Sequence, residues 1–428
     1  MSCEFRRVKL RDIGRIVTGT TPPTSVPGVF GGAIPFVTPS DMDGRKIITS
    51  TERTLSERGF AYVQRQLIPE NAVMVSCIGT HMGKVAMAGA PCVTNQQINS
   101  IICGPEVDPH YLYYALLTRR GWLQTLSRGG SAIPILNKTQ FAQVTIDLPP
   151  YPWQRAVVEC LNPLDDQIAL LSTLNETLES LAKTVFEAWF VKFDPVRAKA
   201  EGRDPEGMDE DIAALFPCQF EESGKGLIPK GWRIRTLDSI ASYLNGLALQ
   251  KYPPVSEDQS LPVIKIKQLK AGNTEGADRS SNTIPPDYVV QDGDVLFSWS
   301  GSLEVEIWCG GPGALNQHIF KVTSNEVPKW YYYLAIKQFL PMFREIAASK
   351  ATTMGHIQRH HLKEAKIALP PPELLRRANA IMEPLIERRI LNSLLARQLS
   401  ELRDTLLPRL ISGKLRVPEA EQVLKEVL

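Results

Sequence analysis

The chain contains the same series of short sequences twice, in the same order. The matched pairs are KLRDIGRIVTG with RTLDSIASYLNG, IPENAVMVSCIG with VQDGDVLFSWSG, TNQQI with LNQHI, DPHYLYYAL with VPKWYYYLA, and IDLPPYP with IALPPPE. The distance between partners falls only from 227 positions (Leu10 to Leu237) to 221 positions (Leu148 to Leu369). Chance similarity does not keep order and spacing over so much chain, so we expect two similar domains in tandem.

One of these pairs excludes an apparent catalytic motif. Asp147-Leu-Pro-Pro-Tyr151 differs by one inserted residue from the Asp-Pro-Pro-Tyr sequence of many DNA adenine methyltransferases. In the second copy Asp147 becomes Ala368 and Tyr151 becomes Pro372, so only Leu-Pro-Pro is shared. The shared part predicts a joint in which the prolines end a strand and start a helix.

A long helical pattern follows each joint. In the first copy, apolar residues recur at spacings of three and four, at Leu161, Leu164, Ile168, Leu171, Leu174, Leu178, Leu181 and Val185. In the second copy, Ile381 and Leu385 are followed by residues with the same spacings, at Leu391, Leu395, Leu399, Leu402, Leu406 and Leu410. Such a narrow stripe favours two helices packed on each other around a pseudo-twofold axis. The alternative is an ordinary amphipathic helix lying on its own domain.

The predicted organisation is therefore α+β, with two similar mixed α/β domains, each followed by a long helix, and the two helices paired as an antiparallel coiled coil. The predicted segments are a first domain at 1–150, a first helix at 151–193, a linker at 194–230, a second domain at 231–371, a second helix at 372–416 and a tail at 417–428. The linker is rich in Pro, Gly and charge, with one short helix expected at Asp209 to Leu215.

Within each domain, β-like runs are expected at Val73 to Ile78, Val93 to Cys103, Val263 to Ile266, Val295 to Trp299 and His318 to Val322, and helices at Tyr111 to Leu126 and Trp330 to Ala348.

Composition is that of an ordinary globular protein. The 428 residues are 43% hydrophobic and 22% charged, and no apolar run reaches the ~18 residues of a membrane span. The start, MSCEFRRVKL, lacks the apolar stretch of a secretion signal, and the seven cysteines form no CxxC pair. These features predict a reducing, cytoplasmic location. The formal net charge of +2 is low for a protein that binds nucleic acid alone, so partners are expected to share the phosphate contacts.

The sequence offers no catalytic constellation. GTHMGKV, residues 79–85, has too few residues between its glycines for a phosphate-binding loop, and Val85 stands where Mg²⁺ needs a hydroxyl. His356, His360 and His361 lie close together in the sequence, but we expect no acidic residue or cysteine to complete a metal site with them. We therefore predict no catalytic residues and no metal ligands.

Polar residues suited to contacting bases gather around the repeated landmarks. Asn and Gln can pair with adenine, and Arg or Lys with guanine. The candidate DNA-binding residues of the first copy are Thr38, Ser40, Asp41, Thr80, His81, Lys84, Asn95, Gln96, Gln97, Arg128, Ser131 and Lys138. Those of the second copy are Lys265, Lys267, Gln268, Ser300, Ser302, Asn316, Gln317, His318, Lys350, Thr352, Thr353 and His356.

These residues have a structural alternative, because polar loop residues usually face water and a buried Asn-Gln pair can cap backbone groups. For Asn95-Gln96 and Asn316-Gln317, which are identical in the two copies, both roles stay open. Gln97 and His318 differ, as do THMGK and SLEVE. Divergent side chains on a repeated scaffold are expected of two domains that recognise different sequences.

Taken together, these landmarks resemble the specificity subunit of type I restriction-modification systems. The resemblance rests on IPFVTPSD, VLFSWSGS followed by ALNQHIFKV, the linker from DPVRAKAEGRDPEG to IPKGW, and the closing ELRDTLLPRLISGKL, and it covers nearly the whole chain. One departure is the acidic SLEVE at residues 302–306, where the first copy has THMGK.

The resemblance implies two target-recognition domains, each reading one half of a bipartite, asymmetric site in double-stranded DNA. It implies that two methyltransferase subunits and motor-nuclease subunits dock on the chain, with no membrane contact. It also implies that S-adenosylmethionine, ATP and Mg²⁺ are bound by those partners rather than by this chain. The alternatives are a stand-alone DNA adenine methyltransferase or nuclease, and a coiled-coil scaffold without a DNA role.

Overall fold

The computed structural model describes residues 5–79, 82–126, 135–224, 226–349 and 355–427. By its internal contacts the chain divides into two units: unit 1 has residues 1–169 and 398–428, and unit 2 has residues 170–397. Two long helices, α5 (Tyr151–Phe186, 36 residues) and α12 (Pro372–Ile411, 40 residues), contribute one part to each unit. Among the described residues we find no helix with the length and apolar character that a membrane crossing requires.

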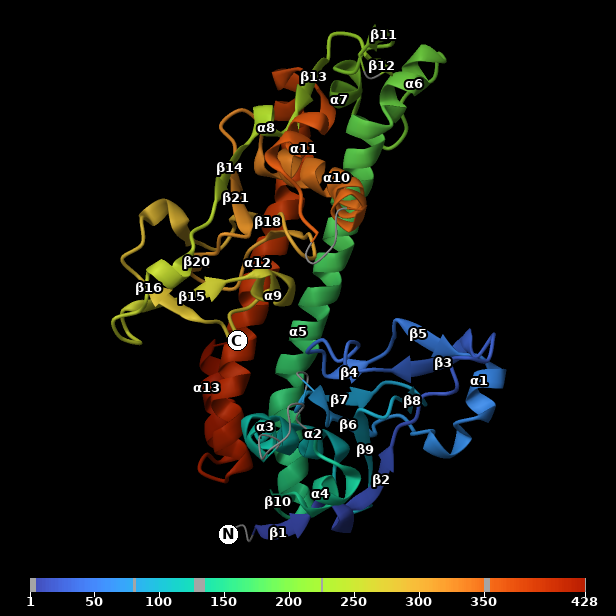
Figure 1. The fold of residues 1–428 in the computed structure, drawn as a ribbon, viewed down its shortest axis with the longest axis vertical. Coiled ribbons are helices and arrows are strands. Elements are labelled where there is room, and N and C mark those ends of the chain that lie inside the picture. The colour runs from blue at the N-terminus through green and yellow to red at the C-terminus, as the bar shows by residue number, and fades with distance from the viewer. Residues whose placement is uncertain (1–4, 80–81, 127–134, 225, 350–354, 428) are drawn as a thin grey trace. The chain divides into compact units, whose positions relative to one another are not determined.

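Unit 1 is built around a five-stranded sheet of order β2-β9-β6-β7-β4, with a three-stranded sheet, β5-β3-β8, and the pair β1-β10 (Figure 1). Helix α2 lies against β6 and β7. Besides its parts of α5 and α12, the elements of unit 1 are β1 (Arg6–Lys9), η1 (Leu10–Asp12), β2 (Gly14–Thr18), β3 (Phe30–Val37), β4 (Ile47–Ile48), β5 (Arg53–Leu55), α1 (Glu57–Ala61), η2 (Gln64–Gln66), β6 (Val73–Ser76), β7 (Val85–Ala88), β8 (Val93–Thr94), β9 (Ile98–Cys103), α2 (Pro109–Leu117), α3 (Arg120–Leu126), α4 (Lys138–Gln143), β10 (Thr145–Leu148) and α13 (Val417–Val427).

Unit 2 has two four-stranded sheets, of order β14-β21-β18-β19 and β16-β15-β20-β17, and the pairs β13-β22 and β11-β12. Its elements besides the long helices are a π-helical turn η4 (Glu187–Val191), α6 (Asp194–Ala200), α7 (Glu210–Ala214), β11 (Phe220–Ser223), β12 (Gly226–Pro229), β13 (Arg233–Thr236), α8 (Leu237–Ile240), β14 (Ser242–Asn245), η5 (Leu249–Lys251), β15 (Ser260–Ile264), α9 (Ile266–Ala271), β16 (Arg279–Ser281), η6 (Pro286–Tyr288), β17 (Val289–Val290), β18 (Val295–Ser298), β19 (Val305–Ile307), β20 (Gly313–Leu315), β21 (Ile319–Thr323), α10 (Lys329–Ser349), α11 (Arg359–Glu364) and β22 (Lys366–Leu369).

The two units repeat the same strand pairing. β1 pairs with β10 and β13 pairs with β22, each antiparallel and in the same register. β6 lies between β7 and β9, as β18 lies between β19 and β21. A short parallel pair, β3 with β8, recurs as β15 with β20. The prediction of two similar mixed α/β domains is confirmed.

The Leu-Pro-Pro joints behave as predicted. β10 ends at Leu148 and α5 begins at Tyr151, and β22 ends at Leu369 before α12 begins at Pro372. The aromatic repeat needs a correction of one position. Tyr111, matched with Trp330 by sequence, donates its hydroxyl to the Asp147 carbonyl oxygen at 3.2 Å. Tyr331 makes the same bond to Ala368 at 3.2 Å, so Tyr331 is the true counterpart of Tyr111.

Several predicted elements are shorter than expected. The expected helix over 111–126 is divided into α2 and α3, and the expected strand over 93–103 into β8 and β9, with a turn at 95–97. β15 ends at Ile264, so Ile266 starts a helix rather than ending a strand. Past the second long helix, the segment predicted as a tail forms α13.

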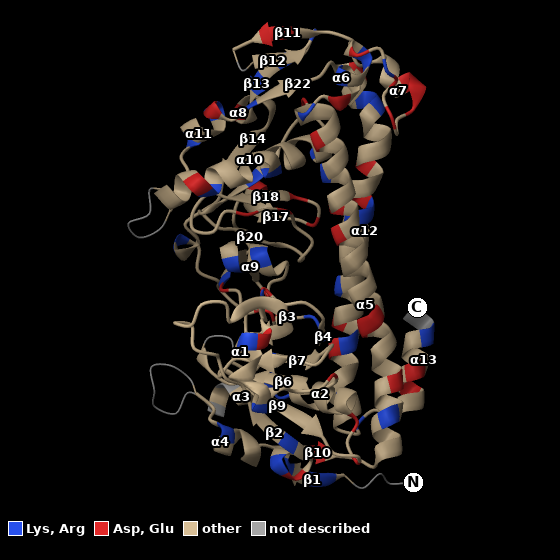
Figure 2. Ribbon diagram, turned by 90° about the vertical axis from the view of Figure 1, so that its right-hand side faces the viewer, with Lys and Arg blue, Asp and Glu red and all other residues tan. Residues whose placement is uncertain are grey.

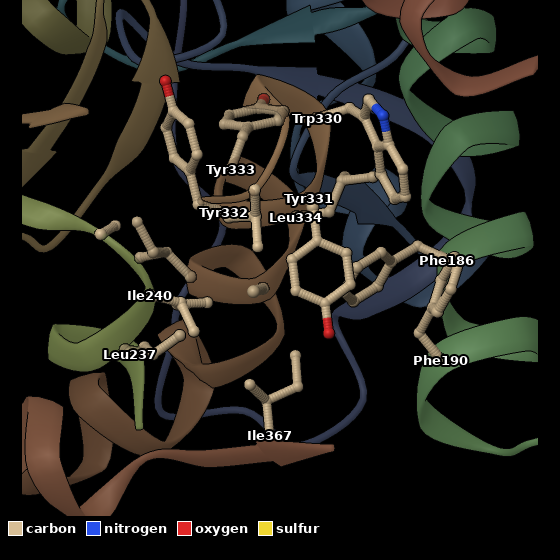
Figure 3. Close-up of a cluster of buried hydrophobic side chains, with 14 of the residues drawn as sticks. Phe186, Phe190, Leu237, Ile240, Trp330, Tyr331, Tyr332, Tyr333, Leu334 and Ile367 are labelled. Atoms are coloured by element: carbon tan, nitrogen blue, oxygen red, sulfur yellow. The ribbon is translucent and has the colours of Figure 1, made fainter. Parts of the chain in front are cut away.

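The segment predicted as a linker is more structured than its composition indicates. Besides the expected short helix α7, it contains α6 and the β11-β12 hairpin. Its Val196, Ile212 and Phe216 are buried in the main core of unit 2. That core is aromatic: Figure 3 shows Phe186 and Phe190 from the α5–η4 segment facing a row of side chains from α10. Apolar residues scattered among Pro, Gly and charge therefore close one end of unit 2.

The leucine stripes of α5 and α12 are only partly covered. Within unit 1, Leu161, Leu164, Leu406 and Leu410 are buried. The exposed members of the stripes, all within unit 2, are Leu174, Leu181, Ile381, Leu391 and Leu395, and the neighbouring Leu170 of α5 is 58% exposed. In Figure 2 acidic and basic positions are interspersed along both helices. Pairing of the two helices therefore does not bury all of the leucines in the stripes.

Candidate nucleic-acid interface

A loop follows the strand β6 in unit 1 and β18 in unit 2, and a buried serine closes each loop. Ser76 accepts a hydrogen bond at its hydroxyl from the Lys84 backbone N–H at 3.0 Å, and Ser298 accepts one from the Glu304 N–H at 2.8 Å. The sequence alignment set Lys84 opposite Glu306, but these bonds make Glu304 its counterpart. The second loop is therefore two residues shorter, and its acidic residues do not occupy the positions expected from the alignment.

Each unit has a glycine at a point where its backbone passes very close to the backbone of an asparagine turn. A Cβ on Gly19 would lie 2.2 Å from the Asn95 carbonyl oxygen, and one on Gly246 would lie 2.2 Å from the Asn316 carbonyl oxygen. The glycine N–H groups donate to Ile98 and Ile319, each at 3.1 Å. Any side chain would push these two segments apart, so the same contact is built into both units.

The repeated asparagines hold the turn that this contact positions. The side-chain oxygen of Asn95 accepts from the Gln97 N–H at 3.1 Å, and that of Asn316 accepts from the His318 N–H at 3.2 Å. This is an Asx turn, in which the side chain replaces a backbone acceptor. The identical geometry supports the structural role for both asparagines, each of which is nearly fully buried.

A third segment joins these two loops in each unit. In unit 1, Cys77 N–H donates to the Gln97 carbonyl at 2.7 Å, and Leu136 N–H donates to the Cys77 carbonyl at 2.8 Å. In unit 2, Trp299 N–H donates to the His318 carbonyl at 3.2 Å, and Ile357 N–H donates to the Trp299 carbonyl at 2.9 Å. We call the loops at 77–79, 95–97 and 135–137, and their counterparts at 299–301, 316–318 and 356–358, the loop frame.

The side chains on the loop frame differ between the units although the backbone does not. Unit 1 carries Cys77, Ile78, Gln97 and Ile135, whereas unit 2 carries Trp299, Ser300, His318 and His356 at the same places. In unit 2 the His318 ring lies between the Ser300 hydroxyl, 3.1 Å from Nδ1, and the Gln317 amide, 3.3 Å from Nε2. Trp299 Nε1 donates to Asn245 at 2.8 Å, and its ring lies 5.6 Å from that of His318.

Most of the described candidate residues lie on or beside the loop frame. These are Thr38, Asn95, Gln96, Gln97, Lys138, Lys265, Ser300, Ser302, Asn316, Gln317, His318 and His356. Thr38 and Lys265 directly follow the parallel strands β3 and β15, next to the asparagine turns. Thr80, His81, Arg128, Ser131, Lys350, Thr352 and Thr353 lie outside the described residues. The repeat thus brings together residues that are distant in sequence.

Some candidates have bonds within their own domain. The Asp41 carboxylate accepts from the Thr38 N–H and hydroxyl, each at 2.7 Å, and from the Glu52 N–H at 2.8 Å. Ser40 beside it is exposed. The Lys84 ammonium donates to the Pro39 carbonyl at 3.0 Å. These bonds fold the turn after β3, so Asp41 and Lys84 have a structural role.

On the second copy, Lys265 forms an ion pair with Asp278, and Gln268 is buried with its amide 3.4 Å from the Glu275 carbonyl oxygen. Lys267 is exposed on α9, a basic helix in Figure 2. Trp299 and Asn245 were missed as candidates. The sequence did contain a sign of their importance: Cys77 and Trp299 differ although each follows a serine that the two copies share, Ser76 and Ser298.

The three histidines near α11 also need a correction. Glu364 lies 3.9 Å from the His360 Nε2, and His360, His361 and Glu364 place ligand atoms within 4.8 Å of one another. The sequence interpretation had found no acidic residue to join the histidines. His361, however, accepts from the Gln358 N–H at Nδ1, as Gln140 accepts from the Asn137 N–H in unit 1. The shared geometry makes His361 a helix cap.

In unit 1 a buried cluster connects the domain to the long helices. Asp165 of α5 accepts from the Tyr114 hydroxyl at 2.5 Å and from Arg403 of α12 at 2.8 Å, and lies 3.4 Å from the Lys46 ammonium. Burial lowers the pKa of Lys46, although Asp165 opposes this shift. We call these residues the Asp165 cluster.

In unit 2 a different cluster makes the connection. Glu179 of α5 pairs with Lys337 of α10 and, at 3.0 Å, with Arg389 of α12. Glu306 of β19 completes it, 3.2 Å from Lys337 and 2.8 Å from Arg389. Burial alone would raise the pKa of Glu179, but Arg389 and Lys337 outweigh burial and lower it. We call these residues the Glu179 cluster.

Comparison with known proteins gives a consistent result. The profile of the family described as "Type I restriction modification DNA specificity domain" matches residues 4–180 and 229–397. The chain is 28% identical to the type I restriction enzyme MjaIX specificity subunit of Methanocaldococcus jannaschii, covering 96% of this chain and 93% of that protein. It is 24% identical to the HindI specificity subunit of Haemophilus influenzae, over 68% and 72% of the two chains. A crystal structure of the type I restriction-modification S subunit from M. genitalium aligns with a TM-score of 0.49 at 15% identity, over 96% of each chain.

The family match covers both copies of the repeat, including the loop frame of each. The resemblance expected from the landmarks is confirmed, and this chain belongs to the type I restriction-modification DNA specificity family.

Proposed function

We propose that this chain is the DNA sequence-recognition subunit of a type I restriction-modification complex and that each unit reads one half of a bipartite, asymmetric site. The observation that carries the proposal is the loop frame, which has the same hydrogen bonds in both units but different side chains. Two readers of one chain need a common scaffold and different base contacts. The chain supplies recognition and leaves catalysis to its partners.

We also propose that α5 and α12 pair as an antiparallel coiled coil whose length fixes the distance between the two DNA-reading surfaces. We call this helix pair the ruler. Support comes from contacts within each unit: Asp165 meets Arg403 in unit 1, and Glu179 meets Arg389 in unit 2. Asn175 also bonds to Asn392 at 3.0 Å and to Ser393 at 2.9 Å. The partners on α12 have lower numbers as those on α5 rise. Helix length would then set the gap between half-sites, as dimer geometry does for other DNA-binding proteins.

A matched insertion tests the ruler. Seven residues added to both helices keep each apolar face in phase and lengthen each helix by ~10 Å, which is roughly three base pairs. The preferred gap between half-sites should grow while both half-sites stay the same. The control is the same insertion in α5 alone, which removes the register of the pair. An unchanged gap after the matched insertion would refute the ruler.

We also propose that methyltransferase subunits dock, two to each chain, on the long helices, and that motor-nuclease subunits join them. The exposed leucines support this, because Leu174, Leu181, Leu391 and Leu395 are 41% or more exposed within unit 2. S-adenosylmethionine, ATP and Mg²⁺ would be bound by those subunits. The substrate would be cellular duplex DNA, which places the complex in the cytoplasm.

Two experiments separate this function from its alternatives. A stand-alone methyltransferase would bind labelled S-adenosylmethionine as an isolated chain, whereas we expect binding only with the partner subunits present. A scaffold without a DNA role would not shift duplex DNA in a gel, with or without those partners. We expect a sequence-dependent shift that strengthens when the methyltransferase partner is added, because the net charge of +2 leaves phosphate contacts to the complex.

A further inference from the structure

The loop frame separates what the two units share from what they do not. The shared residues bind backbone groups: the side-chain oxygens of Ser76, Ser298, Asn95 and Asn316 accept from backbone N–H groups, and the N–H groups of Gly19 and Gly246 donate to carbonyl oxygens. They build the frame and cannot distinguish one half-site from another. The differences are therefore concentrated in the side chains that the frame carries between these fixed points.

Resting on the proposed function, we infer that positions 97 and 318, supported by 78 and 300, determine which half-site each unit prefers. Gln97 and His318 follow the asparagine turns at equivalent places, and each is partly exposed. The Asn95 amide donates to the Gln97 side-chain oxygen at 2.9 Å, so the Gln97 amide is held in one orientation. Ser300 and Gln317 hold the His318 ring from both of its nitrogens.

The chemistry of the two positions differs in a way that bases can distinguish. A carboxamide offers a donor and an acceptor side by side, which fits the major-groove edge of adenine. An imidazole offers one donor or one acceptor at each nitrogen and cannot make that paired contact. In unit 2 the neighbouring Gln317 amide lies against the ring, so His318 and Gln317 act together. The Trp299 ring lies 5.6 Å from the His318 ring, and Asn245 fixes Trp299 by accepting a hydrogen bond from its Nε1.

Reciprocal exchange tests this inference in the full chain with its partner subunits. The variants are His318→Gln, which gives unit 2 the unit 1 side chain, and Gln97→His, which does the reverse. Sequencing of methylated sites in a host carrying each variant reports the preferred bases in both halves. We expect each variant to change base preference in one half only, a different half for each, with about ten-fold less methylation of the original site. Ser300→Ile and Ile78→Ser form a second reciprocal pair if either first variant fails to fold.

Two controls keep the outcomes distinct. Glu345→Gln, at an exposed position of α10 that is not part of the loop frame, should leave both halves unchanged. The slope of binding affinity against salt should also stay the same for all four exchanges, because base contacts carry no counterion release. If the wild-type chain directs a bipartite site and the exchanged variants keep its bases and methylation level, the inference is wrong and the proposed function stands. If the wild type directs no bipartite site, the proposed function fails as well.

Discussion

The two units agree in the backbone of their loop frames and disagree in how they are fixed to the long helices. Unit 1 uses one carboxylate, Asp165, with Lys46 and Arg403 around it. Unit 2 uses two carboxylates, Glu179 and Glu306, which share Lys337 and Arg389. The positions are not equivalent, because the Leu-Pro-Pro joints match Asp165 with Ile386 rather than with an acid.

This difference shows which features the duplicated fold depends on. The loop frame is held by backbone atoms, small residues and Asx turns, so it tolerates changes in the side chains it presents. The attachment to the helices is made of long charged side chains, whose positions differ between the copies. The presence of a buried ion cluster does not by itself show that the cluster stabilises the fold. Removal of one partner is nevertheless strongly destabilising, because it leaves a buried charge without compensation. The comparison therefore predicts equal effects in the frames and unequal effects in the clusters.

The largest effect is expected in the Asp165 cluster. Asp165→Asn removes the buried carboxylate that contacts both the Lys46 and the Arg403 charge, so unfolding free energy should fall by ~3–5 kcal/mol. The matched control is Asp166→Asn, at the exposed neighbouring position. Chemical denaturation measures both variants. A loss for Asp165→Asn no greater than that for the control would show that the cluster does not hold unit 1.

The next effect should be the same in both units. Gly19→Ala and Gly246→Ala each place a methyl group against a backbone oxygen 2.2 Å away, so each should cost ~1–3 kcal/mol through forced backbone shifts. The measurement is thermal unfolding of the two variants in parallel. Gly28→Ala, at a glycine with nothing near the new Cβ but with a positive φ of 74°, controls for backbone conformation alone. A large effect in only one unit would contradict the shared frame.

A smaller effect is expected in the Glu179 cluster. Glu179→Gln leaves Glu306 to balance Lys337 and Arg389, so the loss should be ~1–3 kcal/mol. Because the pKa of Glu179 is lowered in the folded chain, its contribution is present above the ordinary value of 4.5 and is lost as pH falls through the lowered pKa. The difference from wild type should therefore shrink below about pH 4.5. Glu176→Gln, exposed on the same helix, is the control, and a pH-independent difference would count against the cluster.

The smallest effect on stability concerns the acidic loop of unit 2. Glu304 pairs with Arg344 at 3.0 Å and lies 3.8 Å from Lys270, so Glu304→Gln should change stability by only ~0–1 kcal/mol. It would instead release two cations from a neighbouring negative charge. We expect tighter nonspecific DNA binding, with a steeper fall of affinity as salt rises. Glu257→Gln, in an exposed loop elsewhere in unit 2, is the control; an unchanged salt slope would mean that the loop lies away from DNA.

The sequence was sufficient for the repeat, the mixed α/β domains and the Leu-Pro-Pro joints, because each depends on residues close together in the chain. It also marked the turns at Asn95 and Asn316. It could not separate their structural role from a DNA contact, because the partner of each side chain is a backbone N–H whose position depends on the turn.

Other features depend on contacts between distant segments. The linker was misjudged because the burial of Val196, Ile212 and Phe216 comes from packing on α5, α10 and neighbouring elements. The acidic SLEVE loop was placed two residues out of register, and its Glu306 proved to belong to the Glu179 cluster. Likewise, the periodic spacing of leucines in α5 and α12 does not predict which of these leucines are buried in the fold and which are exposed.

The central claim is that two units with one frame and different side chains each recognise half of a split DNA site. Sequencing of methylated positions in the host genome, with and without this gene, tests it most directly. We predict a motif that is present only with the gene and has two unlike half-sites separated by a gap of fixed length. A single continuous motif, two identical half-sites, or a methylation pattern unaffected by the gene would contradict the account.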